Sequence, residues 1–396
     1  MKRILAALII ALALPAHAQG SRGAPDIRPG PLQDILARIP ADASGLIYLN
    51  DLAAARRQVD PLTTDAPTDL DRALAPMSSA FLPAALDQNS LLYFPDGGKE
   101  ALGFSVFELD QIAGWGDPPQ APLVATGIDR HGDAIAERLR ARGFAATPTQ
   151  GHTVWHLQDD FKIDIARRND DPLTGPLGQS QRIVVDGDTL LFARGWPVMN
   201  DLLDPGATLA TEPDTAAILR AGYALRGAGD LLGAVIVPFP PSGRLDPGIL
   251  LQSGGNMKPE QFALLLDRMP GRDLPGLPPF LRYGLLLWQD GYDTTGAIVI
   301  PYMSRDTAET ARDRFTALLD VVESPAARRS FAELLPYDRR FEIVGTEARA
   351  VLVLGFTTSA DATAPVSLTT FTNTPRRRLM DMLLLREIDL LIGAGP

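Results

Sequence analysis

The pattern of apolar and polar residues along the chain predicts β-hairpins and amphipathic helices. Alternating apolar positions predict paired strands, and an Asp-Gly dipeptide between them favours a tight turn. Three hairpins follow: 182–185 with 189–194 around Asp186-Gly187, 283–289 with 292–301 around Asp290-Gly291, and 341–344 with 348–356. A further hairpin is predicted around Asp159. Its large apolar residues then share one face: Trp155, Leu157, Phe161, Ile163 and Ile165.

Other segments carry the signals of single strands and of helices. Short apolar runs predict buried strands at 45–50, 90–94 and 122–126. Apolar residues three or four positions apart predict helices over 32–38, 51–58, 68–86, 133–142, 196–203, 213–225, 259–269, 305–322, 325–335 and 375–392. Asn50 or Asp51 is expected to cap the helix at 51–58, and Ser304 or Asp306 is expected to cap the helix at 305–322.

These elements define a fold class. Hairpins outnumber the βαβ crossover units that the pattern allows, so we predict an α+β fold with antiparallel hairpin sheets packed against helices. The chain reads as two halves with a shared order of strand, helix, hairpin and further helix. The matching segments are 121–127, 133–143 and 153–157 in the first half and 296–302, 306–320 and 348–356 in the second. This order suggests an internal duplication.

Two Pro- and Gly-rich stretches, 238–248 and 270–279, are the strongest breaks in the pattern. A chain of 396 residues is long enough for two domains. We therefore predict a signal peptide at 1–18, a loose leader at 19–31, an N-terminal α+β domain at 32–228, a Pro/Gly-rich connection with a short helix at 229–280, and a C-terminal α+β domain at 281–396 that ends in an amphipathic helix.

The first residues resemble a secretion signal. Lys2 and Arg3 precede an apolar run from Ile4 to Leu14, and the small-x-small sequence that ends at Ala18 predicts cleavage before Gln19. An uncleaved membrane anchor is the alternative, but such a run spans only about half of a bilayer core. No later apolar run is long enough to cross a membrane, so we expect a periplasmic or secreted protein.

Composition narrows the range of binding partners and bound groups that we expect. The chain has 37 Lys and Arg against 48 Asp and Glu, for a net charge of −11, and this acidity disfavours binding to nucleic acid. It has no Cys, which excludes disulfides, thiolate metal sites and a lipidated cysteine.

The sequence predicts no catalytic residue, metal ligand or cofactor. His152 and His156 lie on a predicted strand, where four steps separate them by about 13 Å, too far to share one metal ion at about 2.1 Å. The motifs of serine hydrolases, P-loops and dinucleotide-binding folds are absent. Paired acids occur at predicted turns, where Asp stabilises the backbone conformation: Asp159/Asp160, Asp170/Asp171 and Asp186/Asp188.

Two basic clusters are candidate binding sites. Arg130 and His131 precede the predicted helix at 133–142, whose first amides offer an anion site; alternatively Asp133 caps that helix and both residues are exposed. Arg376, Arg377 and Arg378 occupy the first turns of the last helix, where the helix dipole disfavours cations. Intramolecular salt bridges, an anionic partner or peripheral contact with a membrane would offset that cost.

These observations lead to a hypothesis with one alternative. The chain is an exported, non-enzymatic envelope protein that binds a partner protein or a small ligand, with a pocket between the two halves as the natural site. The alternative is an exported hydrolase that uses Asp or Glu chemistry without a linear motif. Convergence of several acids in one cleft, with perturbed proton affinity, would favour the hydrolase.

Overall fold

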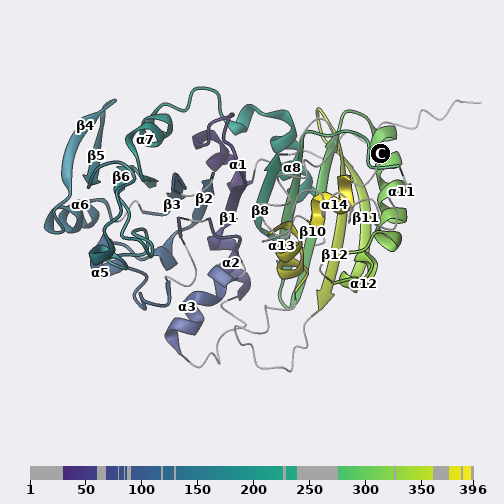
Figure 1. The fold of residues 1–396 in the computed structure, drawn as a ribbon, viewed down its shortest axis with the longest axis horizontal. Coiled ribbons are helices and arrows are strands. Elements are labelled where there is room, and N and C mark those ends of the chain that lie inside the picture. The colour runs from purple at the N-terminus through teal and green to yellow at the C-terminus, as the bar shows by residue number, and fades with distance from the viewer. Residues whose placement is uncertain are drawn as a thin grey trace, which may run out of the picture.

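The computed structural model describes residues 30–59, 68–78, 80–83, 85–86, 91–116, 119–128, 131–225, 229–238, 275–324, 327–359, 374–384 and 387–393. These residues form the expected α+β fold, in which helices pack against both faces of one antiparallel sheet of 12 strands (Figure 1). The strands are β1 (Ile47–Asp51), β2 (Gln111–Trp115), β3 (Leu123–Thr126), β4 (Ala145–Thr149), β5 (His152–Leu157), β6 (Gln181–Asp186), β7 (Thr189–Ala193), β8 (Asp230–Pro238), β9 (Arg282–Asp290), β10 (Asp293–Tyr302), β11 (Asp338–Gly345) and β12 (Ala350–Ser359). Their order in the sheet is β11-β12-β10-β9-β8-β1-β2-β3-β7-β6-β5-β4.

The two faces of the sheet carry different helices. We call the face that bears Leu285, Ile298 and Leu354 face A, and the opposite face, which bears Ala297 and Val353, face B. Face A is covered by α2 (Leu52–Val59), α3 (Asp69–Ser78), α5 (Lys99–Leu102), α6 (Gly132–Ala141), α11 (Arg305–Val321), α12 (Phe331–Leu334), α13 (Pro375–Leu384) and α14 (Glu387–Gly393). Face B is covered by α1 (Pro31–Ile35), α7 (Trp196–Leu203) and α8 (Pro213–Ala224).

The sheet continues without a break between the two predicted halves. β1 pairs with β2 on one side and with β8 on the other. From β1, the chain passes through β2, β3 and α6 to the edge strand β4; from β8, it passes through β9, β10 and α11 to the opposite edge strand, β11. Strand order is therefore similar on both sides of the β1–β8 pair, while the domain limits and the duplication remain predictions.

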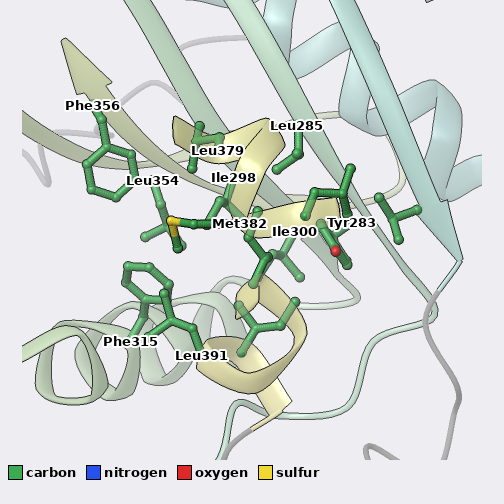
Figure 2. Packing of buried hydrophobic residues seen from close by; sticks show 14 of the residues in the cluster. Tyr283, Leu285, Ile298, Ile300, Phe315, Leu354, Phe356, Leu379, Met382 and Leu391 are labelled. Carbon is green, nitrogen blue, oxygen red and sulfur yellow. The ribbon is translucent and has the colours of Figure 1, made fainter. Parts of the chain in front are cut away.

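The C-terminal helices are part of the core of face A. Leu379 and Met382 of α13 and Leu391 of α14 lie over Ile298 and neighbouring apolar residues of the sheet (Figure 2). All of these side chains are buried. Phe315 of α11 belongs to the same cluster and closes its side. The last helix is therefore held by apolar packing onto strands that precede it by up to about 100 residues of chain.

The turn signals that rest on local chemistry are confirmed. Asp186 pairs with Thr189 around Gly187, and Asp290 pairs with Asp293 around Gly291; both glycines have the positive φ, 61° and 56°, that such a tight turn requires. The cap of α11 is Ser304, whose Oγ accepts a hydrogen bond from the Thr307 amide.

Several predictions of local structure are wrong. No hairpin forms around Asp159: β5 pairs with β4 and β6 instead, and Ile163 and Ile165 are 53% and 51% exposed. β4 carried no signal because it is an exposed edge strand, with Ala145 and Ala146 facing solvent. Residues 91–94 form a turn rather than a strand.

The lengths of three helices also need correction. The helix predicted at 68–86 ends at Ser78, and the one predicted at 325–335 shrinks to α12. The last helix, predicted at 375–392, is seen as α13 and α14. Two strands that were not predicted, β2 and β8, lie near the centre of the sheet, and β8 falls in the stretch that was predicted as a connection.

Some predictions fall outside the described residues. These are the signal peptide with its cleavage site at Ala18 and Gln19, almost all of the leader, the helix at 259–269 and most of the connection at 229–280. Among the described helices, none is both long enough and apolar enough to span a lipid bilayer.

Candidate functional site: a groove at the strand ends

The three arginines at the start of α13 do not converge on one site. The Arg376 guanidinium donates to the Ala80 carbonyl at 2.5 Å, and desolvation lowers the pKa of Arg376 to about 10. Arg377 pairs with Asp381, one turn on, at 3.1 Å. These contacts within the chain offset the unfavourable helix dipole.

Arg378, the third arginine of this cluster, lies apart from the other two. It lies near Tyr337, where its charge opposes the rise that burial causes in the pKa of that phenol. The apolar side of α13 is buried against the sheet, and its exposed residues are Arg377 and Leu384, of which Leu384 is 56% exposed. Peripheral contact through this helix remains a hypothesis.

His131, the second basic candidate, occupies the N-cap position of α6 and makes no capping hydrogen bond with its side chain. Its Nε2 lies 3.3 Å from a carboxylate oxygen of Glu108. Asp133, expected as the cap, lies exposed in the first turn instead, because the helix already begins at Gly132. Arg130 lies outside the described residues, so its pairing with His131 at an anion site remains a prediction.

Of the two histidines of β5, His156 contacts a neighbouring strand and a helix. His156 is 3.0 Å from the Thr147 hydroxyl through Nε2, and its ring is 5.3 Å from that of Trp196. Burial, together with the charge of Arg182, lowers the pKa of His156. In the described part of the chain, no group of three or more His, Asp and Glu side chains is arranged to hold a metal ion.

One of the paired acids is buried and serves the backbone, as predicted for turn residues. Asp171 accepts hydrogen bonds from the amides of Leu173 and Thr174 at 2.7 and 2.8 Å. Its carboxylate also pairs with Arg142 at 2.5 Å and with the Gln181 amide at 3.0 Å. These partners satisfy the carboxylate and fix the irregular segment between β5 and β6.

The structure brings together a different set of residues, at the end of the central strands where α8 stops. A cavity of about 450 Å³ lies there, which we call the strand-end cavity. It is lined by residues of α1, β1, α2, α8, β8 and β9, so both predicted halves contribute to it. Its volume lies in the range of small-molecule sites, which is about 300–1,000 Å³.

A second cavity, of about 230 Å³, adjoins it on face B. We call it the face-B cavity. Its apolar lining consists of Leu225, Trp288, Ala297 and Val353, and its polar lining consists of Asp290, Asp293, Thr295, Arg340, Glu342 and Thr357. Leu225 and Asp290 line both cavities, so we refer to the two together as the groove.

Asp51 forms the most buried polar part of the groove. It ends β1 and caps α2, because its Oδ1 accepts the Ala54 amide at 2.7 Å. Asn50 holds this corner in place through paired hydrogen bonds with the backbone of Phe81, at 2.8 and 2.6 Å. Asp51 is 4% exposed, and desolvation raises the pKa of its carboxyl. The Ala54 amide and the charge of Arg57 oppose this rise, and the charge of Asp230 adds to it.

Gln58 fixes the other polar wall of the strand-end cavity. Its side chain donates to Asp230 at 3.0 Å and accepts the Gly291 amide at 3.1 Å, which ties the start of β8 to the β9–β10 turn. Arg57 lies 3.7 Å from the same Asp230 carboxylate oxygen. These contacts fix the wall, and the charged residues in the described lining of the cavity are Asp51, Asp230, Asp290 and Arg57.

The Thr295 and Thr357 hydroxyls, 2.8 Å apart, form a polar strip on the floor of the face-B cavity. Trp288 closes the floor under α8, because its indole N–H donates to the Gly222 carbonyl at 3.0 Å. At the rim, Arg340 pairs with Glu342, and Asp293 accepts the Ser359 hydroxyl. The groove thus joins an apolar floor to a mostly acidic rim.

The sequence identified some of these residues, but for local reasons. Asp51 was a predicted helix cap and Asp290 a predicted turn residue, and both predictions are confirmed. Their meeting in one cavity had no local signal, since Asp51, Asp230 and Asp290 come from distant parts of the chain.

Comparisons with known proteins add little. No protein-family model matches the sequence, and no curated protein matches it significantly. The solved structure of TP0453 in crystal form I aligns with 11% identity over 92% of this chain and 98% of that chain, at a TM-score of 0.33. Crystal form III aligns with 10% identity over 88% and 97%, at a TM-score of 0.32. These scores do not establish a shared fold.

Proposed function

We propose that this chain is an exported, non-enzymatic protein that binds a small ligand in the groove. The observation that carries this proposal is the strand-end cavity, of about 450 Å³, to which residues from both predicted halves contribute. Ligand sites combine concave apolar surface with a few fixed polar groups, and the groove has both. Export is supported by the N-terminal pattern that ends at Ala18.

Native mass spectrometry of the protein purified from its own source tests the binding proposal. We expect an additional mass that is retained under gentle conditions and lost on denaturation. Thr295→Trp should abolish it, because Thr295 is half-buried on the floor of the face-B cavity, where an indole would occupy the space. Thr295→Val, which keeps the shape of threonine, is the matched control and should retain the mass.

A protein that is always recovered bare would contradict the binding proposal, and so would a retained mass that Thr295→Trp leaves unchanged. Circular dichroism and thermal unfolding establish whether each variant is folded.

Export has a separate test. Cells that produce the full chain are fractionated, and the N-terminus of the recovered protein is determined. We expect a mature protein outside the cytoplasm that begins at Gln19. Intact precursor held inside the cell would refute export without affecting the groove.

Hydrolysis is the second candidate function, because Asp51 and Asp230 line one cavity and the pKa of Asp51 is raised. A carboxyl with a raised pKa is suited to act as a general acid. If the chain is a hydrolase, 4-nitrophenyl glycosides should be turned over by the wild type and not by Asp230→Asn. Our proposal expects no turnover by either.

A further inference from the structure

We propose that the ligand of the groove is an organic ammonium ion with an apolar body, bound with its ammonium group in the strand-end cavity and its apolar body in the face-B cavity. This inference rests on the proposed function and specifies the chemical class of the ligand.

The charges that line the groove are unbalanced. Among the described residues that line the strand-end cavity, the acids are Asp51, Asp230 and Asp290 and the cation is Arg57. Arg57 and Gln58 both contact Asp230, and the charge of Arg57 also acts on Asp51. One cation does not balance three carboxylates, so the described lining has excess negative charge, which attracts a cation.

The hydrogen bonds of the Asp51 carboxylate also favour a cationic ligand. Its Oδ1 accepts the Ala54 amide, whereas its Oδ2 accepts no hydrogen bond from the described residues. Asp51 lines the strand-end cavity although only 4% of the residue is exposed. An ammonium group carries three N–H donors and no acceptor, so it supplies what this oxygen lacks.

Asp290 occupies the junction of the two cavities. It pairs through its backbone with Asp293 in the β9–β10 turn, and its carboxylate makes no hydrogen bond or ion pair within the described part of the chain. A cation in the strand-end cavity therefore has a second acidic neighbour at the point where the face-B cavity begins.

The face-B cavity fits the remainder of such a ligand. Apolar side chains contribute to its floor beside the polar strip of Thr295 and Thr357: Leu225, Trp288, Ala297 and Val353. Its own rim has Asp290, Asp293 and Glu342 against Arg340, so this cavity also has excess negative charge. The described carboxylates of both cavities would repel an anionic ligand, and a neutral ligand would gain no attraction from them.

Isothermal titration of the full chain with three probes of equal length tests the inference: hexylamine, hexan-1-ol and hexanoate. They share one apolar body and differ only in the charge of the head group. We expect hexylamine to bind at least about tenfold more tightly than hexan-1-ol, as charge-assisted hydrogen bonds are worth about 1.5–3 kcal/mol. Hexanoate should not bind, and added salt should weaken the binding of hexylamine.

Two variants locate the charge. Asp290→Asn should weaken hexylamine about fivefold, the size expected for an exposed ion pair, and should leave hexan-1-ol unchanged. Asp201→Asn is the matched control, because Asp201 is an exposed acid on α7 outside the groove. It should change neither probe.

The outcomes separate this inference from the proposed function. If hexylamine and hexan-1-ol bind equally, or if hexanoate binds best, the ammonium class is wrong while the groove remains a binding site. If no probe binds at millimolar concentration although the purified protein retains a mass that depends on Thr295, the ligand is of another class. Absence of both probe binding and retained mass overturns both proposals.

Discussion

Replacement of Asp51 separates its two roles, as a helix cap and as a buried charge. Asp51→Ala removes the acceptor of the Ala54 amide, a hydrogen bond of 2.7 Å at a position that is 4% exposed. Loss of an N-cap costs about 0.5–2 kcal/mol, and burial of the site places the expected loss in the upper half of that range. Asp51→Asn keeps an oxygen that accepts this amide, because Asn caps helices as well as Asp does.

The pH dependence follows from the raised pKa of Asp51. The folded protein holds this proton more tightly than the unfolded chain does, so the free energy of unfolding falls as the pH rises from about 4 through the raised pKa. Asp51→Asn has no such group. Its stability relative to the wild type should therefore increase with pH over this window and then level off.

Urea unfolding between about pH 4 and pH 8, followed by circular dichroism, measures both effects. Asp51→Ala should be less stable than Asp51→Asn at every pH by the cost of the cap. Equal stability of the two variants would refute the capping argument. A constant difference between Asp51→Asn and the wild type across the pH series would refute the argument from desolvation.

Three further predictions concern other parts of the molecule. Leu391→Ala should lower the free energy of unfolding by about 2–5 kcal/mol, because Leu391 of α14 is fully buried against the core of face A. Leu384→Ala, at an exposed position of α13, should change it by less than about 0.5 kcal/mol. Equal effects in urea unfolding would contradict the docking of α14. Arg376→Gln should lower the free energy of unfolding by about 1–3 kcal/mol, because it removes a charged donor from the Ala80 carbonyl. Arg377→Gln should lower it by at most about 1 kcal/mol. The reverse order would disprove the assigned contacts. By NMR, the imidazole of His156 should titrate below pH 6.5. The folded protein then binds this proton less tightly than the unfolded chain does, so His156→Gln should reduce the loss of stability on acidification below that pH. Titration at or above 6.5 would refute the desolvation of His156.

Local chemistry explains which elements were predicted correctly. Asp290-Gly291 favours a tight turn in any chain, and Ser304 caps a helix wherever a helix begins. The hairpin around Asp159 failed for the opposite reason. Its alternating apolar residues satisfy the pattern of a strand, yet β5 pairs with β4, whose exposed residues carry no apolar pattern at all. Pairing depends on which segment reaches the edge of β5, and the pattern does not record that.

The arginines at 376–378 likewise combine a feature that the sequence predicts with one that only the tertiary structure decides. Their position in the first turns of a helix could be read from Thr374 and Pro375, and so could the conflict with the helix dipole. The contact that resolves the conflict for Arg376 is the Ala80 carbonyl, almost 300 positions earlier in the chain. A contact of that kind forms only when the whole sheet is assembled.

Short-range preferences of the chain thus fixed the α+β class, most of the helices and the tight turns, since each depends on residues that are near neighbours along the backbone. The joining of all strands into one sheet, and the meeting of Asp51, Asp230 and Asp290 around a cavity, were decided by folding. The physical reason is that burial and charge–charge interactions act through space, between side chains that the sequence places far apart.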